Sequence, residues 1–165
     1  YSIEKIKTMG DAYMCVGGVP IANTTNALDV VLAAIEMNQF IADYQDERKR
    51  KGQPFFEIRI GIHTGSLIAG VVGKSKFAYD VWGDTVNVAS RLEKAGEAGR
   101  INISEETFQK VKDYFDCSFR GKIAIKNKED INMYFIDAIR EEYRQNDLTE
   151  IPNGKLLSKS TMLKT

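Results

Sequence analysis

The chain has 165 residues, of which 43% are hydrophobic and 28% charged, a composition typical of one soluble globular domain. Its 23 basic residues balance its 23 acidic residues, so the formal net charge is zero. Such a chain has no overall field that would attract nucleic acid or an anionic membrane, and a polyanionic ligand must be held by local charge. Cys15 and Cys117 have apolar neighbours and are too few for a disulfide framework. They indicate free thiols in a reducing, cytoplasmic compartment, although a parent protein could still be tethered to a membrane.

The N-terminal third predicts a hairpin followed by a long helix. Residues 1–8 alternate between apolar and polar side chains, residues 9–11 (Met-Gly-Asp) can form a turn, and residues 12–16 form a second strand-like run. Apolar residues then recur at steps of three and four over residues 27–44. This spacing predicts an amphipathic helix, which a charged run closes at Lys51.

Short strands and two further helices are predicted along the rest of the chain. Ser104 can cap the second of these helices, because it precedes two glutamates that suit the first helical turn. The expected elements are strands at 56–62, 67–72, 79–82 and 101–103, helices at 85–94 and after Ser104, and a closing hairpin of 119–126 and 131–137.

This order of elements predicts an α+β fold with an antiparallel-rich, ferredoxin-like sheet and helices packed on one face. Residues 1–138 are expected to form the domain. From residue 140 on the sequence is polar and aperiodic, so residues 139–165 are predicted to be a C-terminal tail or linker.

Seven polar residues lie where a packed fold has no need of them. Two of them are four residues apart on one predicted helix, so they share a face and can grip the same ligand. Gly10 lets a ligand approach the backbone of the first hairpin closely. The seven are Lys7 and Asp11 beside the first turn, Arg59 on the polar side of its strand, Asp80 on a short strand, Asn87 and Arg91 on the following helix, and Lys128 in the last hairpin turn.

Taken singly, these residues also fit ordinary structural roles. Lys7 fits a solvated strand, Asp11 fits a turn aspartate, and Arg59 fits a weak surface ion pair. The helical pair fits the exposed side of an amphipathic helix. His63 is interpreted as structural or solvent-facing, and Trp82 as part of the core.

Three sequence runs resemble class III adenylyl and guanylyl cyclases, and they occur in the order found in that family. They are residues 6–14 (IKTMGDAYM), residues 59–65 (RIGIHTG) and residues 79–91 (YDVWGDTVNVASR). The third run is among the family's most specific stretches. The resemblance covers residues 1–136 and implies the cyclase type of α+β fold.

The resemblance implies conversion of a nucleoside triphosphate into a 3′,5′-cyclic monophosphate and pyrophosphate, with two Mg²⁺ or Mn²⁺ ions held by two aspartates. Asp11 matches the second of those aspartates, and its hard carboxylate oxygen suits these ions. By the same resemblance, Asn87 and Arg91 orient the ribose and stabilise the α-phosphate, and Arg59 and Lys128 bind the β- and γ-phosphates. The residues around Lys128 depart from the glycines of many members and place a negative charge beside it.

Lys7 and Asp80 match the family positions that read the base, and their chemistry favours adenine. Adenine presents an acceptor at N1 and a donor amine at N6, which complement a donor-only lysine and an acceptor-only aspartate. Guanine reverses that pattern, and guanylyl members carry glutamate and a small polar residue such as cysteine at these positions. The sequence therefore predicts an adenylate cyclase that binds ATP and acts in intracellular signalling.

The resemblance also implies a head-to-tail homodimer, since family members place the metal ligands on one subunit and the Asn–Arg pair on the other. The family's first metal-binding aspartate lies upstream of the residue that matches Tyr1, so the chain is expected to be inactive alone. Truncation is the favoured explanation, because the other site positions are retained. A catalytically degenerate regulatory or dimerisation module of cyclase fold is the alternative. An RNA-recognition module is disfavoured, because its aromatic stacking strand and basic surplus are absent from the sequence.

Overall fold

The computed structural model describes residues 1–75, 77–124, 130–146 and 150–161. Within those residues, no helix combines the length and apolar character needed to cross a membrane. The strands are β1 (Ile3–Met9), β2 (Ala12–Gly17), β3 (Ile60–Ile62), β4 (Ile68–Val72), β5 (Ala78–Trp82), β6 (Ile101–Ser104), β7 (Phe115–Ile123) and β8 (Ile131–Ile139). The helices are α1 (Asn26–Arg50), α2 (Asp84–Ala95), α3 (Glu105–Val111) and α4 (Gly154–Leu157), with a 3-10 turn η1 (Glu141–Tyr143).

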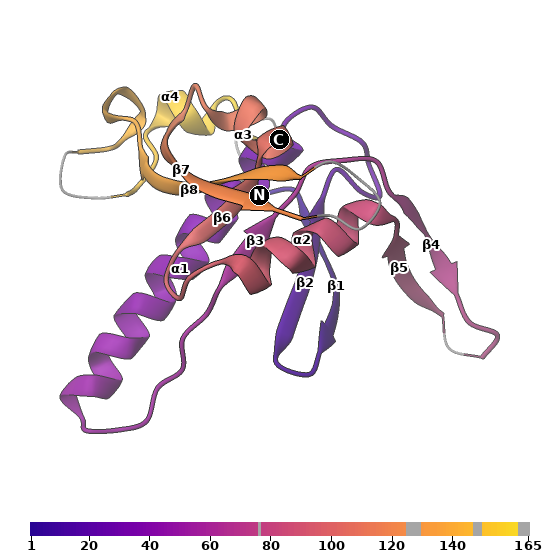
Figure 1. The fold of residues 1–165 in the computed structure, drawn as a ribbon, viewed down its shortest axis with the longest axis horizontal. Helices are drawn as coiled ribbons and strands as arrows, with labels where there is room; N and C mark the ends of the chain where they lie inside the picture. The colour runs from indigo at the N-terminus through magenta and orange to yellow at the C-terminus, as the bar shows by residue number, and fades with distance from the viewer. Residues whose placement is uncertain (76, 125–129, 147–149, 162–165) are drawn as a thin grey trace.

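A four-stranded sheet in the order β3-β6-β8-β7 forms the centre of the fold (Figure 1). β3 and β6 run parallel, and the other two pairs are antiparallel. The antiparallel-rich α+β class is therefore confirmed. β3 is shorter than the strand predicted at 56–62, because its pairing with β6 begins only at Ile60. Phe56 packs instead against Tyr44 of α1, with 5.4 Å between the ring centroids.

Helices α1 and α3 cover one face of this sheet. Side chains alternate along a strand, so Ile62 of β3 and Ile101 and Ile103 of β6 point to the same face. They form a core with Val31 of α1 and Val111 of α3, all of them buried. Burying one such aliphatic side chain contributes about 1.5–3 kcal/mol, so this layer holds the scaffold together.

Helix α2 packs against the opposite face, which corrects the expectation that the helices lie on one face. A Cβ built on Gly61 of β3 would lie 2.1 Å from the backbone nitrogen of Glu93 in α2. The Asn102 amide of β6 donates to the Leu92 carbonyl of α2 at 2.8 Å. The absence of a side chain at Gly61 allows this close approach. Apolar residues spaced at three and four positions show which side of a helix is buried. They do not show which face of the sheet that side packs against.

Two hairpins stand apart from the central sheet (Figure 1). β1 and β2 pair antiparallel with a β-bulge between Lys5 and Lys7, and β1 contacts β5. β4 and β5 form a projecting arm (Figure 1). Several apolar side chains on this arm are exposed, to 71% for Ile68 and to 77% for Phe77, which directly precedes β5. Apolar patches of this kind mark surfaces that bind another molecule.

The described part of the C-terminal segment folds back onto the core, where the sequence predicts a tail or linker. Tyr143 of η1 and Leu156 of α4 are buried and join the same core as α1. Two anchoring side chains in a polar stretch produce no periodic pattern, and so sequence patterning does not detect this packing.

Candidate functional site

Lys7 of β1 and Asp80 of β5 meet as an ion pair, although they are 73 residues apart in the chain. The Lys7 ammonium donates to Asp80 Oδ2 at 2.7 Å, and Asp80 Oδ1 accepts from the Val81 N–H at 2.9 Å. The hydrogen bond from Lys7, helped by that from Val81, lowers the pKa of Asp80, so its carboxylate is ionised at neutral pH. The bulge after Lys5 interrupts the strand alternation, and bulges commonly redirect a side chain in this way.

Asp11 lies exposed at the turn between β1 and β2. Gly10 before it has a φ angle of 62°, a left-handed conformation that glycine adopts without strain. Among the described residues, no three His, Cys, Asp or Glu side chains gather as a metal site. Mg²⁺ is often held by one or two carboxylates together with substrate phosphates, so Asp11 fits the role of one such ligand.

Asn87 and Arg91 lie one turn apart on the exposed side of α2. Leu92 on the other side of the helix is fully buried, which fixes the direction that the pair faces. Arg91 Nη1 donates to the Ala124 carbonyl at 3.0 Å, so its guanidinium lies beside the connection between β7 and β8. Lys128, the phosphate ligand predicted in that connection, lies outside the described residues.

Arg59 has a different environment. Its Nε donates to Glu93 Oε1 of α2 at 2.9 Å, and both side chains are partly exposed. Residues 91 and 93 are about 200° apart around a helix, so Arg59 and Arg91 lie on different sides of α2. The structure thus brings Lys7 and Asp80 together but separates Arg59 from Arg91 within one chain.

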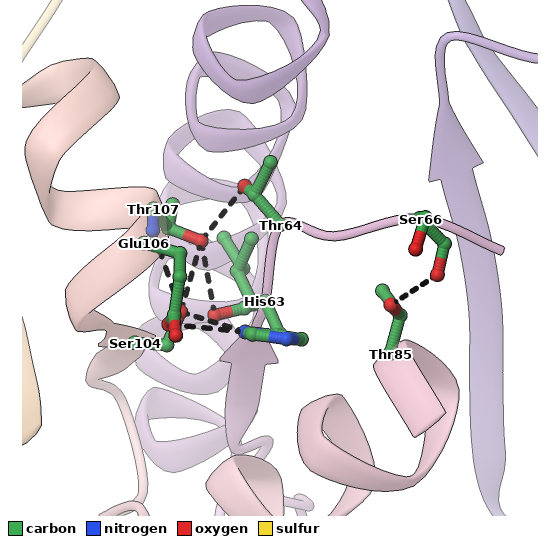
Figure 2. Close-up of polar contacts among 8 residues, drawn as sticks. His63, Thr64, Ser66, Thr85, Ser104, Glu106 and Thr107 are labelled. Carbon is green, nitrogen blue, oxygen red and sulfur yellow. Dashed lines mark hydrogen bonds and ion pairs between the residues drawn. The ribbon is translucent and has the colours of Figure 1, made fainter. Parts of the chain in front are cut away.

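A cleft of about 850 Å³ opens where the parallel strands β3 and β6 end. The Thr85 hydroxyl at the start of α2 donates to the Ser66 carbonyl at 2.6 Å and so ties α2 to the base of the β4–β5 arm (Figure 2). His63 Nδ1 lies 2.8 Å from Ser104 Oγ and 3.5 Å from Glu106 Oε2. Ser104 is fully buried and caps α3, so its hydroxyl is closed to a substrate. These contacts agree with the structural interpretation of His63.

The charge of this cleft does not suit a triphosphate. Its described lining residues include no Lys or Arg but four carboxylates, Asp84, Glu105, Glu106 and Asp130. Hydrogen bonds led by that from the Tyr134 hydroxyl lower the pKa of Glu105, which is therefore negatively charged at neutral pH. Such a lining repels a polyanion. Among the described residues, the lining of this cleft includes none of the sequence-predicted site residues.

Comparisons with known proteins agree with the motifs. The sequence model described as adenylate and guanylate cyclase catalytic domain matches residues 1–138. An adenylate cyclase of Mycobacterium tuberculosis is 39% identical over 136 residues, which cover 82% of this chain and 30% of the relative. Guanylate cyclase 32E of Drosophila melanogaster is 37% identical over 139 residues, which cover 82% of this chain and 12% of the relative. The chain thus spans less than a third of the length of these curated relatives.

The fold also matches a solved structure. The crystal structure of the adenylyl cyclase CyaB from P. aeruginosa superposes with a TM-score of 0.75 at 33% sequence identity. The match covers 84% of this chain and 73% of that one. Relatives of both nucleotide preferences therefore share this sequence pattern, and a member with the adenylyl preference shares the fold.

Proposed function

Because the chain belongs to the family of adenylate and guanylate cyclase catalytic domains, we propose that it converts ATP into 3′,5′-cyclic AMP and pyrophosphate. The observation that supports adenine over guanine is the ion pair between Lys7 and Asp80. Both side chains sit at the family's base-reading positions. The hydrogen bond between them holds both side chains in place, so little ordering is needed when the base binds.

The hydrogen-bond pattern of this pair complements adenine. The Lys7 ammonium can donate to N1, and the Asp80 carboxylate can accept from the N6 amine. Guanine would direct its N1–H at the ammonium and its O6 at the carboxylate, and both contacts would be repulsive. A site that leaves buried polar groups unpaired discriminates strongly against the wrong base.

The remaining predicted residues suit transfer chemistry at the α-phosphate. Asp11 would hold Mg²⁺ or Mn²⁺ by a carboxylate oxygen, and such an ion would lower the pKa of the ribose 3′-hydroxyl and neutralise phosphate charge. Arg91 stays charged and can donate two hydrogen bonds to phosphate oxygens, while Asn87 on the same side of α2 can orient the ribose. Arg59 and Lys128 remain proposed ligands of the β- and γ-phosphates.

We also propose a head-to-tail homodimer with two composite sites. The exposed apolar arm β4–β5 supports it, since Ile68 and Phe77 are left largely uncovered in one chain. The separation of Arg59 from Arg91 within a chain supports it too, because a second copy can bring such groups together across an interface.

A cytoplasmic location is part of the same proposal. Cys15 and Cys117 are both free thiols. Burial raises the pKa of Cys117 to about 12, which keeps the thiol protonated and unreactive. Free thiols of this kind suit a reducing compartment.

The proposal is tested with the full-length protein, Mg²⁺ or Mn²⁺, and ATP or GTP as substrate. Cyclic AMP and pyrophosphate should form in equal amounts from ATP, and the catalytic efficiency with GTP should be lower. Predominant cyclic GMP formation would refute the adenine assignment. Nucleotide binding without turnover would instead favour a regulatory module of cyclase fold.

A further inference from the structure

The described residues of the segment after the family match at 1–138, namely 140–146 and 150–161 and here called the clasp, still close the core. Asn153 organises their described part. Its amide donates to the carbonyls of Glu142 and Arg144 at 3.0 and 3.1 Å, and its Oδ1 accepts from the Leu156 N–H at 3.1 Å. These bonds join η1 to α4 and hold Leu156 in the core, where it is fully buried. The clasp is therefore a folded part of the molecule.

The clasp ends at a buried carboxylate. Asp29, in the first turn of α1, is fully buried. Its Oδ1 accepts from the Thr161 N–H at 3.0 Å, and its Oδ2 accepts from the Thr25 hydroxyl at 2.7 Å. A buried charge is tolerated only when hydrogen bonds replace its water shell, and the N-terminal end of a helix favours a negative charge. Asp29 therefore holds the end of the clasp in place.

The same threonine reaches the start of the first hairpin. Thr161 Oγ1 accepts from the Ser2 N–H at 3.0 Å, and Ser2 directly precedes β1. The neighbouring Tyr1 hydroxyl donates to Glu36 of α1 at 2.5 Å. The start of β1 is thus tied to α1 by two contacts, and the contact through Thr161 forms only when the clasp is docked. Lys7 follows five residues later on the same strand, about 17 Å away.

We infer that Asp29 and Thr161 are positioning residues for the β1–β2 hairpin, acting through the hydrogen-bonded series Asp29–Thr161–Ser2. The hairpin carries Lys7 and Asp11, so its placement against β5 sets the Lys7–Asp80 contact. The effect on nucleotide selection rests on the proposed function, whereas the effect on the hairpin does not. Freeing the start of β1 lets Lys7 shift away from Asp80, so the ability to distinguish the two bases falls.

The experiment compares Thr161→Val with wild type in the full-length protein by amide hydrogen exchange without nucleotide. Valine keeps the N–H that Asp29 accepts and removes the oxygen that Ser2 reaches. Amides of β1 and β2 should exchange roughly three- to tenfold faster, because one hydrogen bond that holds them is lost, while α1 is unchanged. Thr161→Ser should exchange as slowly as wild type, because serine keeps the hydroxyl oxygen that accepts from the Ser2 N–H. Ser158→Ala is the matched control, because Ser158 caps the end of α4 and, among the described residues, its hydroxyl donates only to the Lys155 carbonyl.

Kinetics then separate positioning from general stability. In Thr161→Val, KM for ATP should rise more than kcat falls. The ratio of kcat/KM for ATP to kcat/KM for GTP should drop by about the same factor as the increase in the amide exchange rate. Unchanged exchange in a folded Thr161→Val protein would overturn the inference. Faster exchange with an unchanged ratio would overturn its link to Lys7. A wild-type protein without cyclase activity would refute the proposed function and leave the exchange result to decide the role of the clasp.

Discussion

Replacing the proposed base-reading pair, with Lys7→Glu and Asp80→Cys together, should move nucleotide preference from ATP towards GTP. The introduced carboxylate can accept from guanine N1–H and N2–H, and the thiol removes the acceptor that opposes O6. The structure also predicts the behaviour of the single variants. Because the side chains at 7 and 80 lie within hydrogen-bond distance, Lys7→Glu alone sets two carboxylates side by side and should impair turnover with either nucleotide.

The expected size of the change in nucleotide preference follows from the solvent exposure of the Lys7 and Asp80 side chains. The Lys7 and Asp80 side chains are 41% and 17% exposed, so solvent screens their attraction in the free protein and the pair adds little to stability. Under the proposed function, discrimination between the two bases arises when the base covers these side chains. One well-placed buried hydrogen bond is worth about 1–3 kcal/mol, so each substitution should move the preference ratio by roughly 5- to 150-fold.

The measurement is the ratio of kcat/KM for ATP to kcat/KM for GTP, because the double variant should be slow with both nucleotides. Lys5→Glu is the matched control: it makes the same charge change on the same strand, where Lys5 lies over the Tyr13 ring. It should leave the ratio unchanged. If the double variant folds and turns over with the wild-type ratio, Lys7 and Asp80 do not read the base.

Three further variants test the rest of the site and the scaffold. Asp11→Ala should abolish turnover with Mg²⁺ or Mn²⁺, and normal activity would rule out its role as a metal ligand. Mixing Asp11→Ala with Arg91→Ala subunits should restore part of the activity through one intact composite site; no recovery despite measured subunit exchange would argue against shared sites. Gly61→Ala should lower the free energy of unfolding by about 1–3 kcal/mol, because the new methyl group meets the backbone of Glu93. Calorimetry should show a Tm lowered by roughly 2–12 °C, while Gly154→Ala, whose methyl group meets open space, should leave the Tm near wild type.

The order of elements up to β8, the α+β class and the family can all be predicted from the sequence alone. Periodicity is a local property, and so the apolar steps of α1 and the alternation through Ile60 and Ile62 could be read directly. The residue run around Asp80 and Arg91 is specific enough to indicate the family, and the site roles that this resemblance implies remain predictions. Helix α3 was likewise readable, because Ser104 as its cap is a short-range signal.

Which of these residues come into contact depends on tertiary packing. The contact between Lys7 and Asp80 joins two hairpins, and no local pattern encodes a distance across 73 residues. The packing of α2 on the opposite face of the sheet is possible because Gly61 has no side chain. A glycine in the sequence shows only that another backbone could approach there, and it does not say which element does so. The clasp was missed for a related reason: its docking depends on a few long-range contacts, such as the one between Thr161 and Asp29, in a segment of polar composition. Three-dimensional packing sets the long-range hydrogen bonds and decides which face of the sheet a helix covers. Secondary-structure propensity and hydrophobic periodicity depend only on residues that are close together in the chain.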